Sequence, residues 1–296
     1  MKAKPFFYLI VLLAPLNSCV REIDLDFGKV PVYYVVSAML NPDSVFRVNL
    51  SRSLRVDQPG PFPLVNDAVV EVSGGGSTLR LIPDDKGNYL LAQKPQKGME
   101  YDLKISCADG TILRASTKVP EEPVVSVLPL PAENYLQVTI IDRTSTEDFY
   151  WVGIRGYDAE DKKYYFETYV ESNFLSFDDF NRTKTIDRFG RNTWGYHFYA
   201  RLPDLSFQGK QAVFKIPWYW LPEGEPYSPY WKNFLYIINA DRHLDQYLKT
   251  AVIQYELGVI GDMPVFYTPI DMYGNISSGK GIFGSCTFSQ FDVTQP

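Results

Sequence analysis

The fold is decided by residues 66–91, NDAVVEVSGGGSTLRLIPDDKGNYLL, together with residues 97–120, KGMEYDLKISCADGTILRASTKVP. Apolar and polar side chains alternate through both stretches, which is the period of a β-strand that buries one face. Glycine and aspartate clusters separate the alternating runs of the first stretch, which therefore predicts three strands. The second stretch predicts a hairpin that turns at residues 108–110. We expect these strands to form a small β-sandwich over residues 30–120.

The pattern resembles the immunoglobulin-like or prealbumin-like sandwiches that occur as accessory modules on bacterial surface proteins. Such a module is a scaffold, and its fold alone implies no activity. Cys107 continues the apolar face of its strand, so we expect it to be a buried free thiol. A disulfide between Cys107 and the distant Cys286 stays open as the alternative, because an oxidising compartment would permit it.

Beyond the sandwich we place a proline-rich linker at residues 121–135 and a larger C-terminal β domain at residues 136–296. Proline has no N–H to give to a sheet ladder, so prolines 123, 129 and 131 favour a linker over a strand. The C-terminal domain is rich in β-branched and aromatic runs, which favour strands. The fold class that we predict is therefore mainly β.

One helix is expected in the C-terminal domain, at about residues 241–257. Its apolar residues recur every three or four positions, which places them on one face of a helix. Asn239 or Asp241 can cap its first turn, and Gly258 can end it. The apolar stripe consists of Leu244, Tyr247, Leu248, Ala251 and Tyr255.

The N-terminus has the composition of a secretory signal over residues 1–18. Two lysines precede a short apolar run that is about half the ~20 residues needed to cross a bilayer as a helix. The sequence Leu16-Asn17-Ser18-Cys19 resembles a bacterial lipobox, in which the cysteine is acylated and becomes the mature N-terminus. We therefore expect lipidation at Cys19, followed by an acidic tether at residues 19–29.

Composition excludes some partners. The chain has 35 acidic and 29 basic residues and a net charge of −6, which argues against binding to nucleic acid or to anionic lipid by charge alone. Apolar residues make up 45% of the chain, enough for a sizeable core. Aromatic residues make up 15%, which favours a β-rich fold with large flat contacts.

No catalytic, cofactor or metal motif is recognisable in the sequence. The two histidines, His197 and His243, belong to no metal-spaced cluster, and no Gly-x-Ser-x-Gly elbow or phosphate-binding loop is present. We therefore expect no cofactor, no metal site and no catalytic residue. An enzyme whose site has no linear signature stays open as a lesser alternative.

Ligand or partner contact is expected in residues 218–231, WYWLPEGEPYSPYW. Its prolines stiffen the segment and its aromatic faces offer contact area for a sugar or a protein. The competing interpretation is a strand whose tryptophans point inward and whose prolines only shape its exit. A second candidate is the polar segment 174–192, which could equally be surface decoration. The contact residues that we predict are Trp218, Tyr219, Trp220, Tyr227, Tyr230 and Trp231.

An ordered set of motifs resembles one family along nearly the whole mature chain. The set comprises the start SC-x-REIDLDF, the stretch LNPDSVFRVNLSRS, the module quoted first, and the tail GNISSGKGIFGSC. The chain is similar in these to the Bacteroidota lipoprotein family catalogued as domain of unknown function 4249. Within the second motif, Asp43-Ser44-Val45 also resembles an O-glycosylation sequon of these bacteria, which makes Ser44 a candidate for modification.

This resemblance implies an outer-membrane lipoprotein that is encoded beside a TonB-dependent transporter. Glu22, Asp24 and Asp26 after Cys19 are similar to a surface-display signal of this phylum, although they are more spread out, so we expect exposure at the cell surface, with a periplasm-facing body as the alternative. The expected function is then a non-catalytic accessory role in capturing or admitting a nutrient. The alternative from another class is a structural or adhesive protein of the cell envelope. The family carries no assigned catalytic residues, so the resemblance transfers none.

Overall fold

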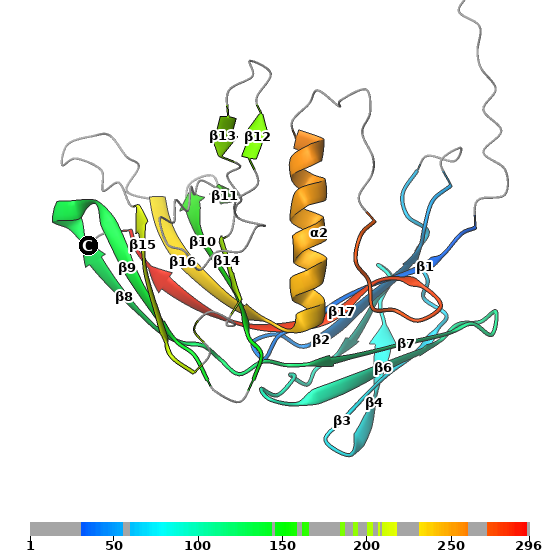
Figure 1. Ribbon diagram of the computed structural model, residues 1–296. Coiled ribbons are helices and arrows are strands. Elements are labelled where there is room, and N and C mark those ends of the chain that lie inside the picture. The colour runs from blue at the N-terminus through cyan, green and yellow to red at the C-terminus, as the bar shows by residue number, and fades with distance from the viewer. Residues whose placement is uncertain are drawn as a thin grey trace, which may run out of the picture.

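The computed structural model describes residues 31–55, 60–143, 146–158, 162–165, 184–186, 192–194, 200–203, 207, 209–217, 231–259 and 271–294. These residues are mainly β, as predicted, with one long helix that stands over the middle of the largest sheet (Figure 1). No helix in the described ranges is long and apolar enough to cross a membrane.

The N-terminal half forms seven strands where the sequence alternates between apolar and polar residues. Their inward faces make the first core, in which Phe46, Tyr89 and Leu103 are almost completely buried. The buried hydroxyl of Tyr89 is satisfied, because it accepts the N–H of Ala68 and donates to the carbonyl of Val65. The strands are β1 (Tyr34–Leu40), β2 (Phe46–Arg52), β3 (Val69–Gly74), β4 (Ser77–Pro83), β5 (Asn88–Leu91), β6 (Glu100–Ser106) and β7 (Ile112–Lys118).

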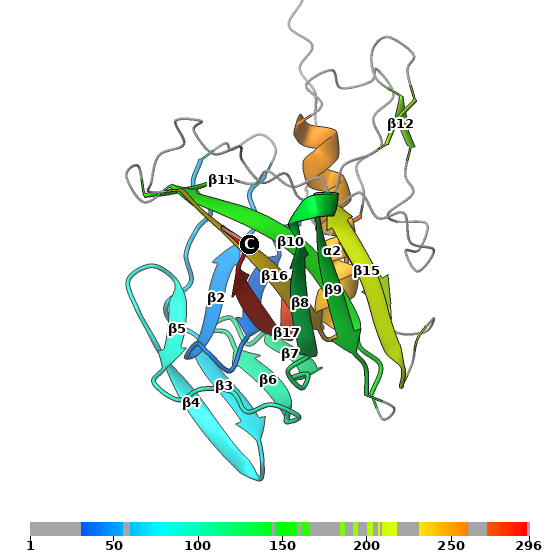
Figure 2. The same cartoon turned by 90° about the vertical axis from the view of Figure 1, so that its left-hand side faces the viewer.

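The C-terminal half has a second core between two sheets. A three-stranded sheet in the order β15-β9-β8 covers β10 and β16, and in Figure 2 it lies in front of them. The elements are β8 (Val124–Leu130), the 3-10 turn η2 (Pro131–Glu133), β9 (Tyr135–Ile141), β10 (Phe149–Asp158), β11 (Lys163–Tyr165), β12 (Lys184–Ile186), β13 (Asn192–Trp194), β14 (Ala200–Pro203), β15 (Gln211–Pro217) and β16 (Trp231–Ala240).

The last strand, β17 (Lys280–Asp292), connects the two halves. Its first part pairs in parallel with β1, and its second part pairs antiparallel with β16. A single 12-stranded sheet therefore runs through both halves, in the order β11-β10-β16-β17-β1-β2-β5-β4-β3-β6-β7 with β14 beside β10. The parallel approach requires glycine at Gly281, where φ is +102° and an added Cβ would lie 1.9 Å from the carbonyl oxygen of Val36.

Residues 121–135 differ from the predicted linker, because residues 124–130 form the strand β8 and residues 131–133 form the turn η2. β8 pairs over its whole length with β9, and Pro129 lies opposite Leu136. Within the described residues β8 is an edge strand of its sheet. A proline on an edge strand sacrifices no ladder bond when its nitrogen faces outward, so prolines did not exclude a strand here.

The predicted helix is present as α2 (Arg242–Val259), and it ends two residues beyond the predicted position. Asp241 caps it as expected, since its Oδ1 accepts the N–H of Leu244 at 2.9 Å. Leu244 packs with Phe149, Trp151 and Cys286 in a third, smaller core between the helix and the sheet. The start of α2 is thereby fixed where the two halves of the molecule meet.

Candidate functional site

Two adjoining hollows lie beside the start of α2. The first, of about 560 Å³, opens between the end of β7, the β7–β8 connection and the first residues of α2. The second, of about 520 Å³, lies over β6 and β7 and shares Ser116 and His243 with the first. We call the two together the junction groove. It is lined by Ser73, Gly98, Glu100, and residues 102–104, 114–121, 146–148, 241–243 and 275.

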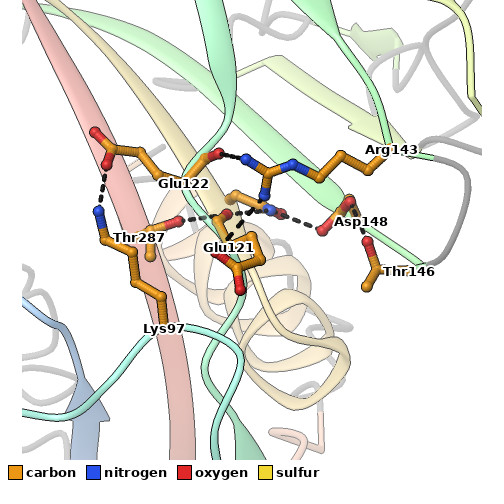
Figure 3. Close-up of polar contacts among 8 residues, drawn as sticks. Lys97, Glu121, Glu122, Arg143, Thr146, Asp148 and Thr287 are labelled. Atoms are coloured by element: carbon orange, nitrogen blue, oxygen red, sulfur yellow. Dashed lines mark hydrogen bonds and ion pairs between the residues drawn. The ribbon is translucent and has the colours of Figure 1, made fainter.

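One wall of the groove is held by partly buried hydrogen bonds to the backbone of Glu121. Its carbonyl accepts the side-chain amide of Asn239 at 3.1 Å and the hydroxyl of Thr287 at 3.0 Å (Figure 3). The same amide donates to Asp148 at 2.7 Å, and Asp148 also accepts the hydroxyl of Thr146 at 2.8 Å. These bonds fix the β7–β8 connection to β16 and β17, so the wall is part of the rigid scaffold.

The rim of the same wall carries exposed ion pairs. Figure 3 shows Glu122 between two cations: Lys97 pairs with its carboxylate, and Arg143 donates to its carbonyl at 2.8 Å. Arg143 also lies 3.9 Å from the carboxylate of Glu121. About two fifths or more of each of these side chains is exposed, so each pair contributes at most ~1 kcal/mol to stability. The rim can therefore rearrange around a ligand at small cost.

Asp241 lies at one end of a chain of three oxygen–oxygen contacts, each 2.8 Å long. The chain runs from Asp241 Oδ2 to Thr117 Oγ1, from there to Ser285 Oγ, and on to the carbonyl of Lys118. The hydroxyl of Thr117 donates to Asp241, and the hydroxyl of Ser285 is in contact with Thr117 and with the carbonyl of Lys118.

The surroundings of Asp241 raise the pKa of its carboxyl. Burial raises the pKa of the Asp241 carboxyl above its ordinary value, and this effect exceeds the lowering by hydrogen bonds from Ser285, Leu244 and Thr117. The other carboxyl oxygen, Oδ1, accepts the backbone N–H groups of Ser285 and Leu244 at 3.0 and 2.9 Å. Asp241 therefore joins β7, β17 and α2 through one buried side chain.

Behind the groove, a buried ion pair fixes the helix to the sheet. Arg201 on β14 binds both carboxylate oxygens of Asp245 on α2, at 2.6 and 2.8 Å, and the indole N–H of Trp151 donates to Asp245 at 3.0 Å. The side chains of Arg201 and Asp245 are only 7% and 2% exposed. The guanidinium also lies 5.4 Å from the ring centre of Phe149. All of these contacts orient α2 over the groove.

His243 lies where the two hollows meet. Its Nδ1 is 2.7 Å from the hydroxyl of Tyr273, and the two rings are stacked with centroids 6.2 Å apart. Burial raises the pKa of Tyr273, so its hydroxyl stays protonated at neutral pH. Which of the two groups donates in this contact depends on the tautomer of the imidazole.

The groove can bind a polar ligand through hydroxyl, amide, imidazole and charged side chains. Several of its carboxylates are already engaged: Arg242 pairs with Glu147, Asp148 accepts two side-chain donors, and Asp241 belongs to the contact chain above. Within the described ranges no three His, Cys, Asp or Glu side chains form a group that could hold a metal ion. The arrangement suits recognition by hydrogen bonds in an open hollow.

Most of the predicted site residues fall on parts of the chain that the structure does not describe. Cys19 and residues 218–230 lie outside the described residues. Trp231 is the first residue of β16, opposite Asp158 of β10, and its side chain is not described. Ser44 is exposed in the turn between β1 and β2, so it is accessible as the modification would require. Of the polar segment 174–192, residues 184–186 and residue 192 are described, in β12 and β13.

The two cysteines, Cys107 and Cys286, are both buried and free, which confirms the expected free thiol at Cys107. Burial raises the pKa of the Cys286 thiol to about 12, so this thiol is protonated and unreactive at neutral pH. Neither thiol lines the junction groove.

The sequence did not predict the junction groove. Asp241 was recognised only as a helix cap, and its partner Thr117 lies 124 residues away in the chain. The groove wall includes the Pro-Glu-Glu-Pro connection after β7, which is visible in the sequence. Its prolines predicted a linker and gave no indication of a groove. Long-range contacts between short polar side chains leave no periodic pattern in a sequence.

The fold and the site define a mainly β protein with two large cores and a polar groove where they meet. The chain belongs to the family described as Domain of unknown function (DUF4249), whose model matches residues 20–292. This confirms the family resemblance that the sequence motifs indicated. No curated protein matches the chain.

Two solved structures are among the matches. A structure titled "Cytokine receptor complex - Crystal form 1A" has 9% identity, a TM-score of 0.25, and coverage of 88% of this chain and 97% of that chain. Fibronectin(III)-like modules of Clostridium thermocellum CbhA have 10% identity, a TM-score of 0.22, and coverage of 72% and 86%. At these TM-scores neither similarity carries an argument about fold or function.

Proposed function

We propose that this chain is a non-catalytic lipoprotein of the outer membrane that helps a TonB-dependent transporter to capture or admit a polar nutrient. The observation that carries the proposal is the junction groove. It is open, it is lined by polar groups, and its engaged carboxylates stabilise the shape of the wall. A polar hollow with a fixed wall and a rim of exposed charges is suited to binding.

Two sequence features support the location and the partner in this proposal. The lipobox-like sequence at Cys19 supports a lipid anchor, which would hold the folded part close to a membrane. The aromatic segment 218–231 supports a contact with the transporter or its ligand. The groove would then hold the nutrient, and the aromatic segment would touch the partner.

The partner is tested by isolating the full-length chain from solubilised outer membranes and identifying the co-purifying proteins by mass spectrometry. We expect a large outer-membrane barrel, and we expect less of it with Trp218→Ala, Trp220→Ala or Trp231→Ala. Phe62→Ala is the matched control, because Phe62 is an exposed aromatic residue elsewhere, with 61% of its surface accessible. Purification without any barrel, together with binding to cells or matrix, would support the structural or adhesive alternative instead.

The groove is tested separately by Ser116→Arg. Ser116 lies in both hollows, so an arginine there fills the groove without removing a core side chain. We expect this variant to retain the barrel and to lose nutrient uptake by at least about tenfold, which is ~1.4 kcal/mol of binding free energy. Ile82→Arg, at a site that is 69% exposed on β4 and lines neither hollow, is the control and should retain both. Unchanged uptake with Ser116→Arg would place ligand binding outside the groove.

A further inference from the structure

The second hollow of the junction groove lies over the face of β3, β6 and β7 that is turned away from the first core. Side chains cross this face in rows that follow the register of the strands. One row consists of Glu71, Lys104 and Arg114. The neighbouring row consists of Ser73, Asp102 and Ser116. All of these residues except Glu71 line the hollow, so the two rows determine which charges a ligand meets there.

The first row places two cations opposite each other. Lys104 on β6 and Arg114 on β7 are direct neighbours in the register, and like charges in such positions destabilise a sheet. Glu71 compensates one of them, because its carboxylate lies 3.3 Å from the ammonium of Lys104. Within the described residues the side chain of Arg114 makes no hydrogen bond or ion pair. A cation that costs stability and is unpaired is available to an anionic group of a ligand.

Asp102 supplies the opposite charge in the neighbouring row. Its side chain is exposed, lies opposite Ser116, and makes no hydrogen bond or ion pair within the described ranges. Diagonal neighbours on adjacent strands have Cα atoms about 7–8 Å apart, which places Asp102 within one small molecule of Arg114. The hollow therefore offers a site for an anionic group and a site for a cationic group side by side.

A ligand with a single charge is a poor match for this arrangement. A simple anion would be repelled by Asp102, and a simple cation would be repelled by Lys104 and Arg114. A neutral sugar would displace water from these charges without offering a counter-charge. The next row adds no net charge, because Glu100 lies opposite Lys118. A molecule that carries both a carboxylate and an ammonium matches the hollow best.

The rest of the hollow has room for the body of such a ligand. Its volume of about 520 Å³ is within the range of small-molecule sites. The hydroxyl of Ser116 and the imidazole of His243 line both hollows and can form hydrogen bonds with a ligand. Asn275 holds the wall in place, because its amide donates to the carbonyls of Ser116 and Phe283 at 3.2 and 2.8 Å.

We propose that the second hollow binds a zwitterion with a primary ammonium and a carboxylate, the chemistry that amino acids and short peptides share. The carboxylate lies at Lys104 and Arg114, and the ammonium lies at Asp102. This inference rests on the proposed function for the groove as the ligand site, and it names the class of the polar nutrient.

Calorimetric titration of the purified full-length chain in detergent tests the charges of the ligand. The probes are the common L-amino acids and alanyl-alanine, and the class that binds more tightly identifies the source of the zwitterion. The tightest probe is then titrated in two blocked forms: the N-acetyl form lacks the ammonium, and the C-terminal amide lacks the carboxylate. We expect each block to weaken binding by at least about tenfold. No binding of any zwitterion, or equal binding of a blocked form, would overturn the proposal.

Substitutions test the two residues that meet the ligand charges. Arg114→Gln should weaken binding of the zwitterion by at least about tenfold and leave binding of the amide form unchanged. Asp102→Asn should have the same effect on the zwitterion and leave binding of the N-acetyl form unchanged. The matched controls are Arg47→Gln and Asp85→Asn, at exposed sites that line neither hollow, and they should bind like the wild type.

Thermal unfolding separates a loss of binding from a loss of structure. Arg114→Gln removes the like-charge neighbour of Lys104, so it should keep or raise the unfolding temperature while it weakens binding. A chain that binds the zwitterion but purifies without a barrel would contradict the transporter partnership and support this inference. A chain that purifies with a barrel, and whose zwitterion binding is unchanged by both Arg114→Gln and Asp102→Asn, would overturn this inference alone.

Discussion

At the scale of single residues, Asp241 has two structural roles. It caps α2, and it joins β7 to β17 through the contact chain that ends at Lys118. Burial raises the pKa of this carboxyl above its ordinary value. Asparagine offers the same acceptor for the cap.

We predict that Asp241→Asn removes a pH dependence of stability. The folded pKa of Asp241 is raised above the ordinary value of 3.8, so between these two values the folded state binds more protons than the unfolded state. Wild-type stability therefore falls as pH rises through this window, and the variant lacks this contribution. Urea unfolding from pH 4 to pH 8 measures the free energy of unfolding of both proteins. As pH rises, the variant should become more stable relative to the wild type.

Asp85→Asn is the control for this series, because Asp85 is exposed in the β4–β5 turn. Its difference from the wild type should stay small and constant with pH. A difference between Asp241→Asn and the wild type that is equally independent of pH would mean that folding does not raise the pKa of Asp241.

A second prediction concerns the buried pair of Arg201 and Asp245. Arg201→Met or Asp245→Asn alone leaves one charge buried without its counter-charge, which should cost about 3–5 kcal/mol of unfolding free energy. The double variant removes both charges and keeps an acceptor for Trp151, so it should lose much less than the sum. Urea unfolding of the four proteins gives the coupling energy.

The exposed pair of Lys97 and Glu122 is the matched control for this cycle. Its two side chains are 42% and 49% exposed, so the corresponding Met and Gln variants should each change stability by less than about 1 kcal/mol. Additive single effects at Arg201 and Asp245 would contradict a coupled pair.

At the scale of elements, α2 stands close to β17 because β17 has glycine at the contact. A Cβ added at Gly284 would lie 2.9 Å from the Cβ of Leu244, which belongs to the capped first turn of the helix. We predict that Gly284→Ala pushes α2 away from the sheet and costs about 1–3 kcal/mol of unfolding free energy. Gly60→Ala, where an added Cβ meets nothing within 4 Å, should cost much less by the same unfolding measurement. Equal stability of the two variants would mean that the helix is free to shift.

The elements were the part that sequence could predict best. The alternating stretch 66–120 gave strands β3 to β7, and the apolar stripe with its cap at Asp241 gave α2. Both signals are local and repeat with the period of one element. The segment 121–135 was misassigned, because the prolines indicated a break and could not show that β8 lies at an edge.

At the scale of the whole molecule, β17 makes the two halves depend on each other. Residues 280–285 pair with β1, and Phe283 is buried in the first core. We predict that residues 31–120 alone remain largely unfolded, as judged by proton NMR dispersion, because the fragment lacks this strand. Residues 271–294 added through a flexible linker should restore dispersed signals. A fragment 31–120 that folds by itself would show that β17 is dispensable for the first core.

The sequence could not predict this connection or the groove beside it. Val35 and Lys280 are neighbours in the sheet and far apart in the chain, and nothing in either segment specifies the other. The same holds for Thr117 and Ser285, whose hydroxyls meet in the groove wall. Such pairings follow from the packing of all the strands together, so only the folded molecule reveals them.

The position of β17 also sets an order of events during synthesis. A ribosome makes β1 early and β17 late. The edge of β1 that pairs with β17 therefore stays open until nearly the whole polypeptide has been made. Contacts of such long range slow folding, and an unpaired strand invites aggregation in the meantime. A chain broken off before residue 280 is therefore expected to be recognised as incomplete and degraded, which gives the cell a built-in check for full-length product.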